Sequence, residues 1–217
     1  MLRAVIFDMD GVIVDSHPIH KKTWRTFLKS QGKEISEEDL NFIMEGRKRE
    51  EILRHFLGEL SEEQMQIFGR QKEQLFRRES SALQPIDGLP EFLRDLEQAE
   101  LRLAVASSGS SGRVNDILVS LDLRNYFQVI VTGDQVTNGK PDPEIFLVAS
   151  DRLSVSPAET LVFEDSVSGV KAAKAAGMKC FGVATNGIIP TLLEAGADHI
   201  IADFSGVSCG VMRRLFE

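Results

Sequence analysis

Polar side chains that could handle phosphate follow four short apolar segments of this 217-residue sequence. Carboxylates follow the first and last of these segments, hydroxyls follow the second, and a lysine lies in the loop after the third. In chain order the residues are Asp8 and Asp10, Ser107 and Ser108, Lys140, and Glu164 and Asp165. Carboxylates can act as nucleophiles, acids, bases or metal ligands, whereas lysine and hydroxyl groups can hold an anion.

Each of these residues alone has a simpler interpretation. A single Asp after a strand commonly forms a turn or caps a helix. Ser107 and Ser108 could cap a helix beginning near Gly112, and Lys140 could be a solvated loop charge. The chemistry therefore depends on the combination, which an open parallel sheet brings together because ligands bind beyond the carboxyl ends of its strands.

Four carboxylates in one crevice predict a cation. Each close like-charged pair costs about 4 kcal/mol at an effective dielectric constant near 20, and one lysine cannot neutralise the group. Mg²⁺ prefers a few carboxylates together with water or phosphate oxygens. We therefore expect a Mg²⁺ site and phosphoryl transfer, with Asp10 able to reach the leaving-group oxygen as a general acid.

The elements that must position these residues follow an alternating pattern. Short apolar segments rich in Val, Ile and Phe alternate with segments of helical periodicity, which predicts a doubly wound α/β fold with a parallel sheet covered on both faces. The predicted strands are Ala4 to Phe7, Leu101 to Ala106, Gln128 to Thr132, Thr160 to Phe163, Cys180 to Ala184 and His199 to Ala202.

Residues 15–83 break this pattern, because they show helical periodicity and no strand. Ser16 with Pro18 predicts one helix start, and capping boxes at Ser36 and Ser61 predict two more. We expect a core domain of residues 1–14 and 84–217 and an inserted all-helical cap domain of residues 15–83. Its apolar core is expected to include Met44, Met65, Phe42, Phe68 and Phe76.

Composition excludes several classes of partner. The formal net charge of −8 opposes binding to nucleic acid or to an anionic membrane. No apolar run approaches the ~18 residues that a membrane helix needs. Cys180 and Cys209 show no metal-ligand or disulfide spacing, and the first residues do not resemble a signal peptide. We expect a cytoplasmic protein.

Four ordered motifs resemble those of the haloacid dehalogenase superfamily of phosphotransferases. They are Asp-Met-Asp-Gly-Val from Asp8, Ser107, Gly-Lys-Pro-Asp-Pro around Lys140, and Glu-Asp-Ser from Glu164. The resemblance implies that Asp8 is the nucleophile and Asp10 the general acid and base. It implies that Ser107 and Lys140 donate hydrogen bonds to the bound phosphate. It also implies that Mg²⁺ is held at Asp8, the Asp10 backbone carbonyl, Glu164 and Asp165, in a monomer.

Within the superfamily, the helical segment resembles that of β-phosphoglucomutase and related sugar-phosphate phosphatases. The resemblance implies that His20, Arg49 and Lys72 contact the substrate, with Arg49 on a phosphate that is not transferred. Ser110 stands where the mutases have a lysine. The alternatives are a partly exposed helical His20, a Trp24 that anchors an apolar core, and a solvated basic face at residues 47–49.

Three functions remain open. The first is a Mg²⁺-dependent phosphatase of a small phosphorylated sugar or similar metabolite. The second is a mutase that interconverts β-glucose 1-phosphate and glucose 6-phosphate through the same phosphorylated Asp8. The third, a phosphorylatable signalling receiver, is disfavoured because its acceptor Asp follows a middle strand of the chain and its fold has no helical insertion.

Overall fold

The predicted apolar segments form one parallel sheet in the computed structural model, which describes residues 1–184 and 189–217. The strand order is β3-β2-β1-β4-β5-β6. Every strand end lies within one residue of its predicted position. The strands are β1 Ala4–Phe7, β2 Arg102–Ser107, β3 Val129–Thr132, β4 Thr160–Glu164, β5 Lys179–Val183 and β6 His199–Ile201.

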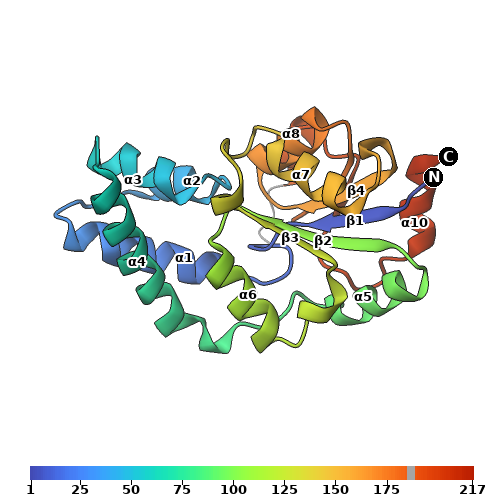
Figure 1. The fold of residues 1–217 in the computed structure, drawn as a ribbon, viewed down its shortest axis with the longest axis horizontal. Helices are drawn as coiled ribbons and strands as arrows, with labels where there is room; N and C mark the ends of the chain where they lie inside the picture. Colours follow the sequence, from blue (N-terminus) through green and yellow to red (C-terminus); the bar gives the residue numbers. More distant parts are fainter. Residues whose placement is uncertain (185–188) are drawn as a thin grey trace.

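Strand β1 lies at the centre of the sheet and is buried along its whole length. Its side chains alternate between two apolar clusters: Val5 and Phe7 belong to one, and Ala4 and Ile6 to the other. Helices cover both faces, which confirms the doubly wound α/β fold (Figure 1). They are α5 Leu89–Gln98, α6 Ser111–Ser120 and α10 Cys209–Arg213 on the Phe7 side, and α7 Glu144–Leu153, α8 Val167–Ala175 and α9 Ile189–Glu194 on the other.

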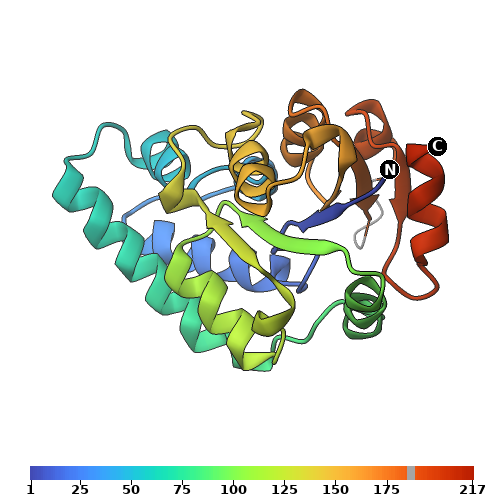
Figure 2. The same ribbon diagram turned by 45° about the vertical axis from the view of Figure 1, so that its right-hand side comes forward.

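Four helices between β1 and α5 form a unit that we call the helical insertion. They are α1 His17–Ser30, α2 Glu37–Met44, α3 Arg49–Leu57 and α4 Glu62–Glu79. They share an apolar cluster of their own, in which Trp24 and Phe27 pack with Leu53. Both ribbon views show these helices beside the sheet, at the end of the molecule away from the chain termini (Figure 2).

The helix starts follow local capping. Ser36 and Ser61 each form the predicted capping box, with Asp39 and Gln64 as the third helical residue. Ser16 precedes α1 as predicted, but its hydroxyl caps no backbone amide and donates instead to Asp10 Oδ1. The first helix of the insertion is therefore tied directly to the loop after β1.

Phe76 corrects one expectation about the apolar core of the insertion. Its side chain is fully buried, but it packs with the cluster under the sheet and not with the cluster of α1–α4. Its ring lies 4.5 Å from the ring of His20. The reason is that α4 is long enough to reach past its own cluster and place its last turn against the sheet domain.

The insertion joins the sheet domain at two adjacent chain crossings. Val14 forms an isolated antiparallel bridge with Pro85, and the Ile86 amide donates to the Ile13 carbonyl at 2.9 Å. The outgoing and returning chain segments thus lie side by side. The crossing agrees with a division near residues 14 and 84, although the two-domain assignment itself stays a prediction.

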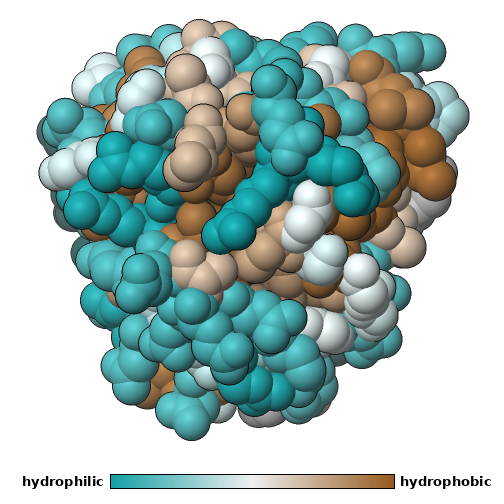
Figure 3. Space-filling model, turned by 90° about the vertical axis from the view of Figure 1, so that its right-hand side faces the viewer, coloured by the Kyte–Doolittle hydropathy of each residue, from teal (hydrophilic) through white to brown (hydrophobic). Residues whose placement is uncertain are grey.

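The remaining elements are short 3₁₀ helices at Ser80–Ala82, Arg124–Tyr126, Gly133–Gln135, Pro157–Glu159 and Arg214–Phe216. The side of the molecule seen in Figure 3 is largely hydrophilic, with separate apolar areas between the polar ones. Within the described residues, no helix combines the length and apolar content that crossing a bilayer requires.

Candidate active site

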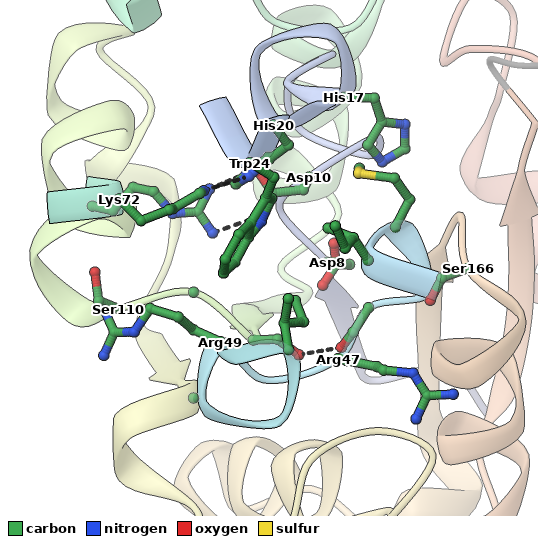
Figure 4. Close-up of a pocket in the computed structure, with 18 of the residues that line it drawn as sticks. Asp8, Asp10, His17, His20, Trp24, Arg47, Arg49, Lys72, Ser110 and Ser166 are labelled. Atoms are coloured by element: carbon green, nitrogen blue, oxygen red, sulfur yellow. Dashed lines mark hydrogen bonds and ion pairs between the residues drawn. The ribbon is translucent and has the colours of Figure 1, made fainter. Parts of the chain in front are cut away.

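Asp8 lies at the carboxyl end of the central strand, where parallel sheets bind their ligands. Its backbone amide donates to the Phe163 carbonyl at 2.9 Å, so the residue continues the alignment of β1 with β4. The carboxylate is 6% exposed and lines a pocket between the sheet and the helical insertion (Figure 4). A nucleophile in this position is accessible from the pocket.

Lys140 forms ion pairs with Asp8 and with Glu164. Its ammonium donates to Asp8 Oδ1 at 2.6 Å and to Glu164 Oε1 at 2.5 Å. The residue is 2% exposed, so the interpretation of Lys140 as a solvated loop charge is wrong. Burial alone would lower the pKa of the lysine, but the two carboxylates raise it above its ordinary value, and the side chain stays charged.

Glu164 and Asp165 stand at the end of the neighbouring strand β4. Glu164 accepts hydrogen bonds from the Ser166 amide at 2.7 Å and the Ser166 hydroxyl at 2.9 Å. The carboxylate fits because residue 169 is glycine, where a Cβ atom would lie 1.8 Å from Glu164 Oε1. Asp165 pairs with a residue that the sequence reasoning gave no role, His17, whose Nε2 lies 3.1 Å from Asp165 Oδ2.

Negative charge is in excess on this side of the pocket. Burial raises the pKa of Asp8 well above its usual range; Lys140 opposes this rise, whereas the carboxylates of Glu164 and Asp165 add to it. Burial also raises the pKa of Asp165, against the hydrogen bond from His17. Such raised values mark carboxylates that lack enough positive charge around them.

The donor set fits a hard divalent cation in its chemistry. Mg²⁺ takes oxygen ligands and uses only a few carboxylates, and Asp8, Glu164 and Asp165 supply these in a region short of positive charge. Among the described residues, however, no three His, Cys, Asp or Glu side chains form a ready-made ligand set. The metal ligands assigned from the sequence stay a prediction.

Ser107 and Ser108 occupy different places although they are adjacent. Ser107 is fully buried and accepts from the Gly109 amide at 3.1 Å, outside the lining of the pocket. Ser108 lines the pocket and donates to the Gly46 carbonyl of the insertion at 2.7 Å. Neither serine caps α6, whose N-cap is Ser110, so the capping alternative for these two residues is wrong.

Asp10 is held by a residue that the sequence reasoning missed. Arg113, on the first turn of α6, donates from Nη1 to Asp10 Oδ1 and from Nη2 to Asp10 Oδ2, both at 2.7 Å. Burial raises the pKa of Asp10, but the Arg113 and His20 side chains hold it well below its usual range. The carboxylate is therefore charged in this structure.

His20 and Lys72 extend this group into the insertion. Lys72 Nζ lies 2.8 Å from His20 Nδ1, and His20 Nε2 lies 3.2 Å from Asp10 Oδ1. With a charged lysine, this geometry makes Nδ1 the acceptor and places the His20 proton on Nε2, toward Asp10. His20 is 9% exposed, so the interpretation as a partly exposed helical histidine is wrong.

The two basic side chains of this group are hard to protonate. Burial and the neighbouring Lys72 lower the pKa of His20 to about 3, and burial and Arg113 lower the pKa of Lys72 to about 7. Figure 4 shows Asp10, His20 and Lys72 together, with His17 and Ser166 across the pocket. The pocket thus has a carboxylate-rich half and a half that contains the basic side chains Arg49, Lys72 and Arg113, which we call the cationic half.

Arg49 lines the same pocket at the start of α3. It pairs with Glu50 at 2.8 Å, and its Nε, like that of Arg47, is buried and has no hydrogen-bond partner among the described residues. Gly69 makes room for its guanidinium, since a Cβ atom there would lie 2.9 Å from Arg49 Cζ. Only about a third of the side chain is exposed, which contradicts a fully solvated basic face.

The loop between α2 and α3 closes the pocket against the sheet domain. Besides the Ser108 contact with Gly46, the Ser168 hydroxyl donates to the Glu45 carbonyl. On the same loop, Lys48 donates to the Val136 carbonyl at 2.8 Å. The predicted side chains from the insertion, His20, Arg49 and Lys72, thus line the same pocket as the strand-end carboxylates.

Two residues of the site, His17 and Arg113, were absent from the sequence prediction. Both lie within the first turn of a helix that follows a strand end, which is the one local signal that could have indicated them. Charged side chains at helix starts are usually solvated, so this signal alone would select many wrong residues.

The sequence and the fold match known proteins. Residues 5–183 match the sequence profile of the family described as haloacid dehalogenase-like hydrolase. The phosphorylated carbohydrates phosphatase of Thermotoga maritima is 38% identical, with 92% of this chain and 94% of that protein covered. The beta-phosphoglucomutase of Bacillus subtilis is 32% identical, with 100% of this chain and 96% of that protein covered.

A solved structure shows the same likeness in three dimensions. Beta-phosphoglucomutase from Clostridium difficile aligns with a TM-score of 0.89 at 25% identity, covering 100% of this chain and 97% of that one. The likeness thus extends over both the sheet and the helical insertion.

Proposed function

Because the chain belongs to the haloacid dehalogenase-like hydrolases, a family of enzymes, we propose that it is a Mg²⁺-dependent phosphatase of a small phosphorylated sugar or similar metabolite. One observation carries this proposal: the buried Asp8 carboxylate, fixed by Lys140 at the end of the central strand, opens into a pocket whose opposite half is cationic. That half suits a phosphorylated ligand, and Asp8 suits attack on its phosphorus.

The first step forms an aspartyl-phosphate. An oxygen of Asp8 bonds to phosphorus as the bond from phosphorus to the sugar oxygen breaks. Asp10, which is charged in this structure, first takes up a proton, as it does from water in the second step, and then gives it to that departing oxygen. Lys140 orients the attacking carboxylate by its hydrogen bond to Oδ1. Ser107, Ser108 and Lys140 are the proposed donors to the phosphoryl oxygens.

The second step releases phosphate. Asp10 takes a proton from a water molecule as its oxygen bonds to phosphorus, and the bond from phosphorus to Asp8 breaks. Asp8, the Asp10 backbone carbonyl, Glu164 and Asp165 are the proposed Mg²⁺ ligands. When bound, the ion supplies positive charge that offsets the repulsion between an anionic nucleophile and a phosphate dianion.

The helical insertion supplies the proposed substrate contacts. His20, Arg49 and Lys72 face the pocket from α1, α3 and α4. We assign residues 15–83 as a cap domain that covers the site and excludes bulk water. The proposed enzyme is a cytoplasmic monomer, in line with its two free cysteines.

A panel of sugar phosphates with purified protein tests the proposal. With Mg²⁺ present, at least one member should release inorganic phosphate over many turnovers, and a chelator should stop the release. No phosphate release from any member, or release that is indifferent to the chelator, contradicts the phosphatase or its metal dependence, respectively.

A mutase is the second candidate, favoured by the buried Nε of Arg49 in the pocket, which has no hydrogen-bond partner within residues 1–184 and 189–217. Such an arginine suits a phosphate that is not being transferred. Ser110, which also lines the pocket, argues the other way because it offers no charge. Given β-glucose 1-phosphate and a trace of the bisphosphate, a mutase forms glucose 6-phosphate faster than free phosphate. The signalling-receiver alternative is excluded by membership of the hydrolase family.

A further inference from the structure

We propose that Arg113 is a positioning residue that aims the Asp10 carboxylate at the reacting phosphate, a role that rests on the proposed function. Both of its terminal nitrogens bond to Asp10, one to each oxygen, at 2.7 Å. A two-point contact of this kind fixes the plane of a carboxylate as well as its position. A proton donor for a departing oxygen needs that orientation.

The hydrogen bonds of Asp10 leave one of its carboxylate oxygens able to accept a further hydrogen bond. Oδ1 is near three side chains, those of Ser16, His20 and Arg113. Oδ2 accepts only from Arg113 among the described residues, so it keeps a free acceptor site. The Asp10 side chain is 21% exposed and lines the pocket. Arg113 therefore turns Asp10 so that Oδ2 is the oxygen available to a ligand.

The surroundings of Arg113 favour positioning over substrate binding. Its side chain is 6% exposed, and Nη1 also lies 3.0 Å from His20 Nε2. Phe76 lies against the guanidinium, with Cζ 5.1 Å from the ring centroid. Gly109 bounds it as well, since a Cβ atom there would lie 2.1 Å from Nη2. By contrast, Arg49 is about a third exposed, and in the part of the chain that the structure describes its Nε has no hydrogen-bond partner.

Stability alone does not account for the pair. A buried ion pair is often no more stabilising than apolar residues of the same volume, because both charges lose their hydration. Apolar residues at both positions could therefore stabilise the fold as well as the ion pair does. A charge pair aimed into the pocket instead fixes the orientation of the one carboxylate that must exchange a proton there.

Two substrates separate the positioning role from a structural one. A sugar phosphate needs a proton on its departing oxygen, whereas p-nitrophenyl phosphate releases a stable anion that needs none. In the first step the phosphorus bond to the leaving oxygen breaks and the bond to Asp8 forms for both. In the second step both share the same phosphorylated Asp8, and Asp10 accepts the proton of the attacking water.

The test compares Arg113→Lys, which keeps the charge but cannot hold both oxygens, with wild type. For a sugar phosphate that wild type hydrolyses, we expect kcat/KM to fall about 100-fold. For p-nitrophenyl phosphate, we expect kcat and KM to fall together, so that kcat/KM stays within about 3-fold and a burst of p-nitrophenolate precedes steady turnover. Asp10→Asn should give the same pattern, and the double variant should lose no more than Asp10→Asn.

Arg77→Lys is the matched control. Arg77, on α4, forms an exposed ion pair with Asp116, which lies on α6 as Arg113 does. This variant should keep the wild-type kcat/KM for both substrates. Equal losses of kcat/KM on both substrates in Arg113→Lys indicate a structural role and overturn the inference. A higher KM for the sugar phosphate alone, with losses that multiply with those of Asp10→Asn, indicates substrate binding and also overturns it.

A second measurement does not depend on turnover. In a double-mutant cycle of urea unfolding, Arg113→Gln and Asp10→Asn should be strongly non-additive. Additive losses overturn the pairing even if the enzyme acts on another substrate. Failure of wild type to hydrolyse any sugar phosphate, with coupling intact, contradicts the proposed function and leaves the positioning of Asp10 supported.

Discussion

Two histidines on the first turn of α1, His17 and His20, lie in opposite electrostatic environments. His17 faces the carboxylate-rich half of the pocket, where burial lowers its pKa but the hydrogen bond to Asp165 raises it to about 9. His20 faces the cationic half, where burial and Lys72 lower its pKa to about 3. Two histidines three positions apart on one helix thus lie on opposite sides of the boundary between the two halves.

The difference shows how the pocket divides its chemistry. The carboxylate-rich half contains Asp8, Glu164 and Asp165 with one lysine, and it comes mainly from strand ends. The cationic half contains Arg113, which binds Asp10, and Lys72, which contacts His20, and it comes mainly from helices. The first half suits a metal ion and a nucleophile, and the second suits an anionic ligand and proton transfer.

The largest expected effect comes from removing the nucleophile of the first half. Asp8→Asn should lower turnover by about 10⁴-fold or more, because an amide is a poor nucleophile. Steady-state phosphate release measures the loss, and circular dichroism should show an unchanged fold. Asp15→Asn, whose parent side chain is exposed, is the control and should keep its activity. Full activity of Asp8→Asn would rule out covalent catalysis by this residue.

Removing the cation of the same half should lower the stability of the fold as well as the activity. Lys140→Met leaves Asp8 and Glu164 buried without their shared partner, which should cost about 3 to 5 kcal/mol of unfolding free energy in urea. Lys179→Met removes a surface partner of Asp198 and should cost less than about 1 kcal/mol. Equal costs for the two variants would show that the buried network does not depend on Lys140.

The pH dependence of stability should separate the two histidines. Because the folded pKa of His17 is raised from 6.5 to about 9, its contribution is complete below pH 6.5 and is lost as the pH rises toward 9. The folded pKa of His20 is lowered from 6.5 to about 3, so the unfolded state binds its proton first and stability falls as the pH drops from 6.5 toward 3.

Urea unfolding at a series of pH values, with a chelator present, measures both effects. Compared with wild type, His17→Asn should flatten the curve on the alkaline side and His20→Asn on the acidic side, each by a few kcal/mol. If the curves of the variants run parallel to wild type, the two halves of the pocket do not differ in charge as the structure indicates.

The smallest expected effect concerns the metal. Asp165→Ala should weaken Mg²⁺ binding by about 10-fold or more, and added Mg²⁺ should restore part of the activity. Displacement of Mn²⁺, followed by its electron paramagnetic resonance signal, measures the affinity without turnover. Unchanged affinity would remove Asp165 from the proposed ligand set.

The carboxylate-rich half was predictable because its residues follow strands. Apolar runs locate β1 and β4 to within a residue, and the parallel pairing of these two strands brings Asp8 beside Glu164. Capping boxes at Ser36 and Ser61 were equally local and equally predictable. Phe76 was misplaced, since periodicity reports that a residue is buried but not which cluster buries it.

By itself, then, the amino-acid sequence determined the sheet, the helical insertion and the acids at the strand ends, because these depend on periodicity and on residues adjacent to them in the chain. Only the tertiary structure decided that Arg113 binds Asp10 and that His17 and His20 face opposite charges. Those contacts join α1, α4 and α6 through helix packing, and the direction of a long side chain across such an interface has no signature in local sequence.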